Sequence, residues 1–154
     1  MAASRAYLLD TNIVLHATRK DSQLSAAVET QFGLVSSGLR PAVCEVSIAE
    51  LLGFTRSHKW GEARIQHLRR ILDGTVVLSI SQPGVHQRWS EIYSHARSKG
   101  WSIQQDHNDV WIAAVAAVSG LTLLSTDKAA FLPFRGTSWL DVILLDAKTG
   151  AILP

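Results

Sequence analysis

Four acidic residues are the side chains of this sequence best suited to chemistry at a shared site: Asp10, Glu50, Asp109 and Asp127. They are far apart along the chain, so only the fold can bring them together. Carboxylates that share a pocket repel one another and resist ionisation unless a cation lies among them. The hard ions Mg²⁺ and Mn²⁺ take oxygen ligands, polarise phosphoryl oxygens and lower the pKa of bound water. If they are gathered, these acids predict metal-dependent hydrolysis of a phosphodiester bond.

The elements that would position these acids are short apolar strands that alternate with helices. Apolar runs predict strands at residues 6–9, 42–44, 76–78, 121–124 and 142–145. Apolar residues at helical spacing predict helices at residues 24–35, 48–55, 63–72, 85–96 and 110–118. This alternation favours a parallel sheet with helices on its faces. We therefore predict an α/β fold around a parallel five-stranded sheet.

A sheet of this kind would place all four acids along one edge. Asp10 and Asp127 directly follow predicted strands. Glu50 lies in the predicted first turn of one helix, and Asp109 opens another. A helix that connects parallel strands runs antiparallel to them, so its N-terminus lies at the carboxyl edge of the sheet, where open α/β sheets bind ligands. We therefore expect the four carboxylates to converge at that edge.

Each acid also has an ordinary structural role that its position predicts. Asp10 can cap the helix that follows it, and Ser47-x-x-Glu50 has the spacing of a capping box. Asp109 would interact favourably with the dipole of its own helix, and Asp127 is typical of a turn. Only the convergence of all four acids favours the chemical role over these structural ones.

The predicted helix at residues 110–118 is apolar on all sides, which indicates a buried helix. Asn108 is the predicted cap at its start, and Gly120 is the predicted end. Asp106 lies three residues before Asp109 and either approaches the acidic site or only caps the helix. The sequence leaves both roles open.

The segments around the four acids resemble the motifs of PIN-domain nucleases. The matching segments are Leu8-Leu9-Asp10-Thr11-Asn12, Ser47-Ile48-Ala49-Glu50-Leu51, Asp109-Val110-Trp111-Ile112-Ala113-Ala114 and Gly120-Leu121-Thr122-Leu123-Leu124-Ser125-Thr126-Asp127. Phe131 also stands where these proteins often carry a phenylalanine. The length is most similar to that of VapC toxins of toxin–antitoxin pairs. The resemblance spans about residues 8–131, and we expect residues 1–154 to form one domain whose final strand lies in segment 132–154.

This resemblance implies a PIN-like three-layer sandwich and a metal-dependent endoribonuclease. At the matching motif positions, the residues that bind Mg²⁺ or Mn²⁺ would be Asp10, Glu50, Asp109 and Asp127. The polar residues that support these ligands would be Thr11, Asn12 and Thr126. The resemblance also implies an RNA substrate, such as tRNA or ribosomal RNA, a small VapB-type antitoxin as partner, and a homodimer.

Individual roles follow from this resemblance and from the chemistry of metal-bound water. Asp10 and Asp109 would hold the principal ion. Glu50 and Asp127 would complete the site directly or through water. A water activated in this way would attack the phosphorus atom and leave 5′-phosphate and 3′-hydroxyl ends, so no Ser, Cys or His nucleophile is required.

The densest basic stretch lies at residues 56–70, where Glu62 is the one acidic residue. Its basic residues are Arg56, His58, Lys59, Arg64, His67, Arg69 and Arg70. They could follow an RNA backbone, and Arg56 is the best candidate because it lies closest to the Glu50 motif. The alternative for each of these residues is a solvated helix face.

Three alternatives belong to other functional classes. A phosphatase of the haloacid dehalogenase type also begins with a strand and an Asp, but it needs a second Asp two residues later, where this sequence has Asn12. A receiver-like domain needs paired acids after the first strand, and the segment around Asp10 lacks them. A non-catalytic PIN-like RNA-binding module would be favoured if one of the four acids were missing. All four are present, so the nuclease is preferred.

The composition is that of one globular domain: 154 residues, 47% of them hydrophobic, with a net charge of +2. This mild basic excess permits nucleic-acid binding without requiring it. The single cysteine, Cys44, excludes an internal disulfide framework and favours a cytoplasmic protein. The longest apolar run, residues 110–118, is about half of a membrane span, so no membrane association is expected. Packing, rather than base stacking, is the predicted role of Trp89 and Trp111. It is also the favoured role of Trp60 and Trp101, whose alternative is to anchor a partner.

Overall fold

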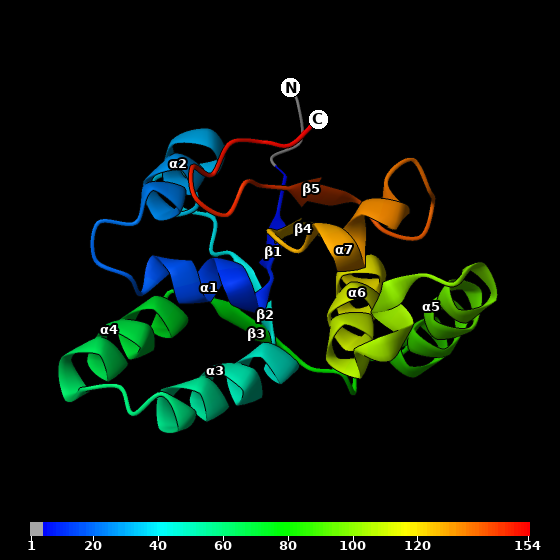
Figure 1. The fold of residues 1–154 in the computed structure, drawn as a ribbon, viewed down its shortest axis with the longest axis horizontal. Helices are drawn as coiled ribbons and strands as arrows, with labels where there is room; N and C mark the ends of the chain where they lie inside the picture. Colours follow the sequence, from blue (N-terminus) through cyan, green and yellow to red (C-terminus); the bar gives the residue numbers. More distant parts are fainter. Residues whose placement is uncertain (1–4) are drawn as a thin grey trace.

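The centre of the fold is a parallel sheet of five strands (Figure 1). The structure is a computed structural model that describes residues 5–154. Its strands are β1 (Tyr7–Leu9), β2 (Ala42–Cys44), β3 (Val76–Leu78), β4 (Thr122–Ser125) and β5 (Val142–Leu144). They lie in the order β3-β2-β1-β4-β5, and all neighbouring strands are parallel. The predicted five-stranded parallel sheet is therefore confirmed.

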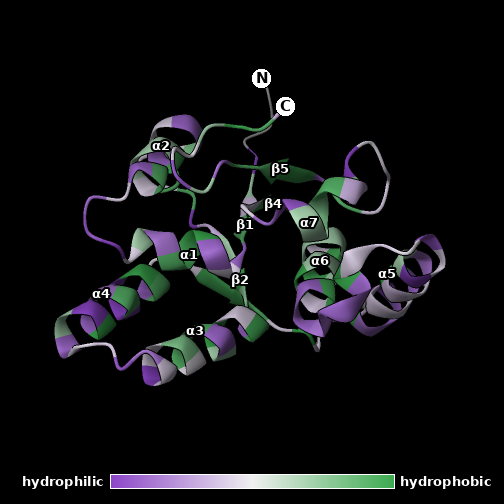
Figure 2. Cartoon of the chain, in the orientation of Figure 1, coloured by the Kyte–Doolittle hydropathy of each residue, from purple (hydrophilic) through white to green (hydrophobic). Residues whose placement is uncertain are grey.

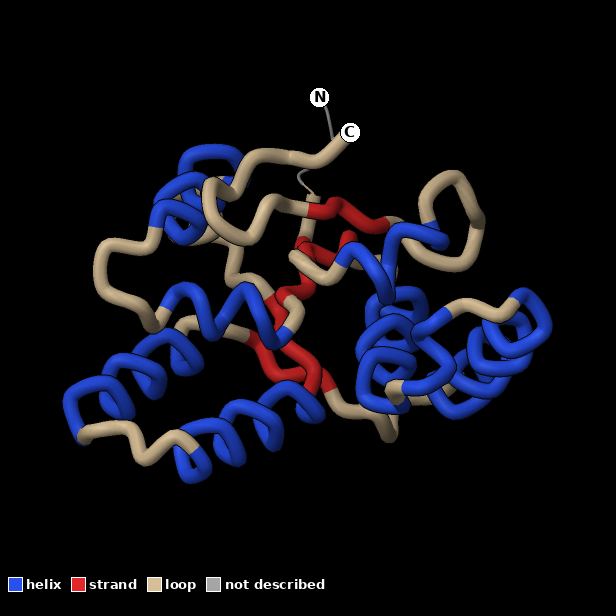
Figure 3. The backbone as a smooth tube through the Cα atoms, in the orientation of Figure 1, coloured by secondary structure: helices blue, strands red, loops and turns tan. Residues whose placement is uncertain are grey.

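Helices cover both faces of this sheet and form the outer layers of the fold (Figures 1 and 3). One layer contains α1 (Thr11–Ala17), α2 (Gln23–Phe32), α3 (Glu45–Ser57) and α4 (Glu62–Asp73). The other layer contains α5 (Val85–Lys99), the 3₁₀ helix η1 (Ser102–Gln105), α6 (His107–Ser119), α7 (Lys128–Phe131) and the 3₁₀ helix η2 (Leu132–Phe134). The predicted three-layer α/β sandwich is confirmed.

Each face of the sheet has its own apolar core, because consecutive side chains of a strand point to opposite faces. Leu8 and Leu123 pack in the core beneath α5 and α6, whereas Leu9 and Leu124 pack in the core beneath α1–α4. Strands buried on both faces are apolar at consecutive positions, and Figure 2 shows β2 and β5 as hydrophobic segments. Four tryptophans pack half-buried against these two cores, as predicted: Trp60, Trp89, Trp101 and Trp111. Trp139, for which the sequence made no prediction, does the same.

Helix α6 is the buried apolar helix that the sequence predicts, but it begins earlier than expected. Its cap is Asp106, whose Oδ1 accepts hydrogen bonds from the backbone N–H groups of Asn108 (3.0 Å) and Asp109 (3.4 Å). The predicted cap at Asn108 is wrong, because Asn108 already lies in the first turn. Gly120 ends the helix at a left-handed φ of 66°, as predicted. No helix within residues 5–154 is both long and apolar enough to cross a membrane.

Helix α3 also begins earlier than predicted, because strand β2 leads into it without a loop. Its first residue is Glu45, so Glu50 lies in the second turn rather than the first. Ser47 is fully buried within the helix, and the cap residue Cys44 makes no side-chain capping bond. The predicted capping box at Ser47 and Glu50 is therefore wrong.

Helix α2 ends earlier than the apolar spacing predicts. Gly33 adopts a left-handed φ of 59°, and its N–H donates to the Glu29 carbonyl. The Glu29 carboxylate then accepts hydrogen bonds from the backbone N–H groups of Val35 (2.9 Å) and Ser36 (3.0 Å). Val35 was expected on the buried helix face, but it lies beyond the helix and is 83% exposed.

The end of α3 holds a lysine in a conformation that favours glycine. Lys59 has a φ of 49°. The backbone N–H groups of Lys59 and Trp60 donate to the carbonyls of Arg56 (3.2 Å) and Thr55 (3.0 Å). These two bonds form a Schellman ending, in which glycine commonly occupies the left-handed position. The backbone is therefore strained at Lys59.

Replacement of Lys59 by glycine is expected to stabilise the fold by about 1 kcal/mol, because glycine adopts this conformation without the strain that a side chain imposes. The melting temperature should rise by about 3 °C for a chain of this size. Lys59→Ala is the matched control, since it removes the same charge but keeps a Cβ atom. Equal stabilisation by both variants in thermal unfolding would assign the gain to the lost charge and contradict the prediction.

Candidate active site

The four predicted acids line one pocket of about 390 Å³ at the carboxyl edge of the sheet. Asp10 directly follows β1, and Asp127 follows β4. Glu50 extends from α3, and Asp109 extends from the first turn of α6. The other residues that line the pocket are Thr11, Asn12, Leu15, Phe54 and Asp106. The structure therefore brings the four carboxylates together, as their positions in the sequence predicted.

Asp10 is the most deeply placed of these acids, with a side chain that is nearly buried. Its Oδ1 accepts a hydrogen bond from the backbone N–H of Thr11 at 2.8 Å, and its Oδ2 accepts one from Ser125 Oγ at 2.6 Å. Burial raises the pKa of Asp10 to about 6, and the charges of Glu50 and Asp127 add to this effect, although the two hydrogen bonds oppose it. The carboxylate is thus oriented by its partners but costly to ionise.

Thr11 connects the start of α1 with α3 inside the pocket. Its hydroxyl donates to Glu50 Oε1 at 2.7 Å and lies 2.9 Å from Ser47 Oγ. Because Ser47 is fully buried, this contact fixes the Thr11 hydroxyl against the body of α3. The structure therefore places Thr11 beside an acid and gives the buried serine of α3 a polar partner, while the support of a metal ligand by Thr11 stays a prediction.

Asp109 is the acid with the least compensation. It is half-buried, and its carboxylate accepts no hydrogen bond from residues 5–154. Burial raises its pKa to about 8, and the negative charges of Asp10, Asp106, Asp127 and Glu50 add to the rise. None of the residues that line the pocket within the described part of the chain is Lys, Arg or His. The pocket therefore has an excess of negative charge that its own side chains do not neutralise.

Asp127 and Asp106 each combine a structural role with a place in the pocket. Asp127 Oδ1 accepts the backbone N–H of Ala130 at 2.9 Å and caps α7. Asp106 caps α6 and also lines the pocket. Both roles that the sequence left open for Asp106 are thus present, and a fifth carboxylate stands at the edge of the site.

Ser125 is a residue of the site that the sequence analysis missed. Its fully buried hydroxyl donates to Asp10 and accepts the backbone N–H of Asp127 at 2.9 Å, so it links two of the four acids. The predicted supporting residue was its neighbour Thr126, whose side chain forms no hydrogen bond within residues 5–154. The signal that could have found Ser125 is a small polar residue at the end of an otherwise apolar strand.

Two further predicted residues lie at the surface. Asn12 is exposed and lines the pocket, without a side-chain hydrogen bond to residues 5–154. Arg56 is exposed in the last turn of α3 and does not line the pocket. The support of the metal ligands by Asn12 and the contact of Arg56 with RNA stay predictions.

The donor set of the pocket fits a hard divalent cation. In residues 5–154, no three His, Cys, Asp or Glu side chains are arranged to hold one ion between them. Three protein ligands are not required, however, because Mg²⁺ commonly binds to one or two carboxylates and keeps several waters. Asp10 and Asp109 supply such carboxylates, and their raised pKa values indicate the uncompensated charge that a cation would neutralise.

A parallel five-stranded sheet with acids gathered at its carboxyl edge defines an α/β protein with an acidic pocket. The sequence model of the PIN-domain family matches residues 7–133. The chain therefore belongs to the PIN-domain family. A search of curated protein sequences returned no significant match.

Several solved structures share this fold. VapBC2 from Rickettsia felis, bound to a DNA fragment from its promoter, matches with a TM-score of 0.73 and 22% identity, over 89% of this chain and 96% of that one. VapBC-1 from nontypeable Haemophilus influenzae matches with a TM-score of 0.72 and 18% identity, over 90% and 97% of the two chains. FitAcB from Neisseria gonorrhoeae matches with a TM-score of 0.69 and 23% identity, over 88% and 95%. At these identities the likeness establishes the fold.

In EDTA, the protein is expected to lose stability as the pH rises from about 4 to about 8. Asp109 keeps its proton in the folded protein up to a pKa of about 8, whereas its ordinary value is 3.8. Between these values the folded state binds more protons than the unfolded state, so the free energy of unfolding falls as the pH rises. Asp10, with a pKa of about 6, adds to the fall at the acidic end of this range.

Asp109→Asn should flatten this pH dependence and stabilise the protein at pH 8 by about 2 kcal/mol, a gain that is reduced because Asp109 is partly open to water. The control is Asp73→Asn, an exposed acid at the end of α4, which should change stability by less than about 0.5 kcal/mol. Urea unfolding at a series of pH values measures both. If the free energy of unfolding of Asp109→Asn depends on pH as in the wild-type protein, Asp109 is not the cause of the loss of stability.

Proposed function

We propose that this protein is a metal-dependent endoribonuclease that acts as the toxin of a VapBC-type toxin–antitoxin pair. The observation that carries the proposal is the gathering of four carboxylates in one pocket of a PIN-domain chain: Asp10, Glu50, Asp109 and Asp127. The similar solved structures support it, because their names describe VapBC toxin–antitoxin complexes. We place the activity in the cytoplasm, where RNA substrates are abundant.

Asp10 and Asp109 would hold Mg²⁺ or Mn²⁺ in this enzyme. Glu50 and Asp127 would complete the site directly or through water. When bound, the ion would supply a polarised phosphoryl oxygen and a bound water of lowered pKa. Cleavage by such a water leaves 5′-phosphate and 3′-hydroxyl ends and needs no nucleophilic side chain.

The residues around the acids orient them and shape the space for the substrate. Ser125 and the Thr11 N–H hold the two oxygens of Asp10, and the Thr11 hydroxyl holds Glu50. Leu15 and Phe54 form an apolar part of the pocket wall. An apolar wall lowers the local dielectric constant and strengthens the interactions of the carboxylates with positive charge. Asp10 and Glu50 are thus oriented by the chain itself.

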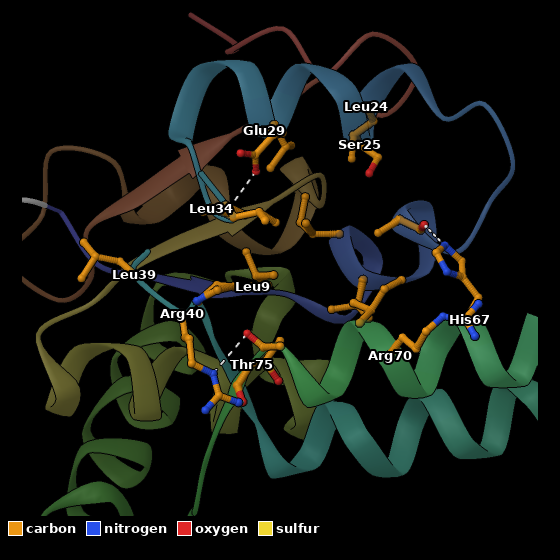
Figure 4. A pocket seen from close by; sticks show the side chains of 18 of the residues that line it. Leu9, Leu24, Ser25, Glu29, Leu34, Leu39, Arg40, His67, Arg70 and Thr75 are labelled. Carbon is orange, nitrogen blue, oxygen red and sulfur yellow. Dashed lines mark hydrogen bonds between the residues drawn. The ribbon is translucent and has the colours of Figure 1, made fainter. Parts of the chain in front are cut away.

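A second hollow supports the proposal of a protein partner (Figure 4). This apolar groove of about 700 Å³ lies between α1, α2 and α4, and Leu9 and Leu24 line its interior. Leu39 lines its edge and is 44% exposed, and Arg40 and Arg70 add positive charge beside it. We propose that a small VapB-type antitoxin inserts an apolar segment here, and that the toxin forms a homodimer.

Purified protein is expected to cleave cellular RNA in the presence of Mg²⁺ or Mn²⁺ and to lose this activity in EDTA. Asp109→Asn should reduce the cleavage rate at least about a hundredfold, because it removes a ligand charge from the ion. Asp109 is well suited to this test, since its carboxylate has no hydrogen bond within residues 5–154 whose loss would disturb the fold. Sequencing of the cleaved ends identifies the substrate and the end chemistry.

Asp73→Asn provides the matched control for this assay, because it makes the same chemical change at an exposed position outside the pocket. It should cleave at the wild-type rate. Folded wild-type protein that binds RNA but does not cleave it with either ion, when free of a co-purified inhibitor, would favour a non-catalytic RNA-binding module over the nuclease.

Ser125→Ala is expected to lower the affinity for Mn²⁺ about tenfold, because the Asp10 carboxylate would lose the hydrogen bond that orients it and favours its charged form. Thr126→Ala removes a neighbouring hydroxyl that bonds to none of the acids and should leave the affinity unchanged. Calorimetric titration of both variants with Mn²⁺ measures the difference. A larger loss in Thr126→Ala would assign the supporting role to Thr126.

A further inference from the structure

Phe54 is a large apolar side chain that contributes to the acidic pocket rather than to the interior. It is half-buried on α3 and forms part of the pocket wall. Within residues 5–154, neither core cluster includes Phe54, although Ile48 and Leu51 of the same helix pack in the core beneath α1–α4. The hydrophobic core therefore does not explain why an aromatic ring stands beside the carboxylates.

The ring of Phe54 continues outward from the pocket as an aromatic stack. His58 lies on it with ring centroids 3.8 Å apart and planes inclined by 12°. His58 Nδ1 is 3.1 Å from the Phe54 carbonyl oxygen and 3.0 Å from Ser57 Oγ, so the imidazole ring is held in this orientation. His58 is nevertheless exposed. The stack thus ends in a solvent-exposed ring, and Phe54 is the one aromatic ring in residues 5–154 that contacts it.

This stack lies in line with Glu50, one of the four acids of the pocket. Glu50, Phe54 and His58 are spaced by four residues along α3, and residues at this spacing lie above one another on one helix face. Glu50 and Phe54 both line the pocket, whereas His58 lies one turn beyond it. A chain that leaves the acidic pocket along this face of α3 would meet the His58 ring next.

The stack is supported by contacts of Trp60 and Arg64. Trp60 contacts the Phe54 ring edge-on, with centroids 6.0 Å apart. The guanidinium of Arg64 lies 3.6 Å above the Trp60 ring and donates to Thr18 Oγ1 at 3.2 Å. Trp60 in turn packs against the core beneath α1–α4. A planar ligand that stacks on His58 would therefore find its platform already formed.

Two cationic residues are close to His58 in the sequence. Arg56 and Lys59 flank His58 in the sequence, and both are exposed. The salt bridge between Arg88 and Glu91 is the one ion pair in residues 5–154, so neither cation is neutralised by an acidic partner there. Exposed aromatic rings combined with cations are the features by which proteins bind single-stranded nucleic acid.

We propose that the Phe54–His58 stack is a base-binding subsite, where His58 stacks on an unpaired base of the RNA chain that leaves the acidic pocket. This inference rests on the proposed nuclease function and goes beyond it, because it assigns a contact with the RNA to His58, which lies outside the acidic pocket. A base engaged in duplex stacking cannot place its face on His58. The substrate must therefore present unpaired nucleotides, as in a loop or a single strand.

The subsite makes a different prediction from a purely structural role of the stack. Aromatic pairs spaced by four residues also stabilise helices, so loss of the pair alone would lower the melting temperature without changing RNA affinity. A docking surface for a protein partner would also leave RNA affinity unchanged. The test therefore measures RNA binding. It removes the aromatic ring from the protein and, independently, one base from the RNA.

The experiment uses the Asp109→Asn protein, which should not cleave, and a fluorescent single-stranded RNA of mixed sequence, about twelve nucleotides long. His58→Ala should weaken binding in fluorescence anisotropy about tenfold, and His58→Phe should restore it, because phenylalanine supplies a ring without a charge. Phe54→Leu should also weaken binding, since leucine keeps apolar volume but removes the supporting ring. A fully paired duplex of the same sequence should bind equally to all four proteins.

A scan with single abasic nucleotides then locates the stacked base. One abasic position should weaken binding to the parent protein about tenfold, and the same position should cause no further loss in His58→Ala. RNA affinity that is unchanged by His58→Ala would overturn the subsite, as would an equal loss with duplex RNA. If the wild-type protein still cleaves RNA in that case, the nuclease function stands without the subsite. Absence of any RNA binding by the wild-type protein would overturn both.

Discussion

Repulsion among carboxylates at the carboxyl edge of the sheet is the constraint on which this structure depends. Asp10 follows a central buried strand, so the fold removes it from water wherever the neighbouring acids lie. Ser125 and the Thr11 N–H compensate Asp10 in part, and the Thr11 hydroxyl compensates Glu50. Asp109 receives no such hydrogen bond within residues 5–154, and its pKa rises furthest. The folded chain thus keeps unfavourable carboxylate interactions in the acidic pocket, and strongly perturbed pKa values of this kind are typical of functional sites.

The pairing of β1 with β4 determines which side chains lie next to one another in the acidic pocket. Leu9 is in register with Leu124, and the Asp10 N–H donates to the Leu124 carbonyl at 3.0 Å. The next residue along each strand is therefore Asp10 on one side and Ser125 on the other, and their side chains meet. Because Ser125 also accepts the Asp127 N–H, the register of one strand pair fixes the relation between two acids. The two apolar cores, one on each face of the sheet, hold this register in place.

The strands, their parallel order and the convergence of the acids could be predicted from the sequence, because each rests on a repeated local pattern. Short apolar runs indicated strands buried on both faces, and each acid stood at a strand end or a helix start. The residues that the prediction missed depend on contacts between distant segments. Ser125 was passed over for Thr126 because only the β1–β4 register shows which hydroxyl reaches Asp10. The cap of α6 was placed at Asn108 rather than Asp106 because both residue types make good caps.

Helix α3 shows why the missed features gather near the site. Its start carries no capping signal because β2 leads directly into it, and its end places Lys59 where glycine would be less strained. The residues at both ends of the helix that supplies Glu50 are thus not those that helix ends usually favour. The middle of the helix is held by the buried side chain of Leu51. Such conflicts persist where the surrounding structure over-determines the backbone, and they are commonest at functional sites. In the proposed enzyme, α3 would therefore act as a rigid arm, with Glu50 at the metal and a ring platform one to two turns further on. A platform held in this way would select RNA by the shape that it already presents.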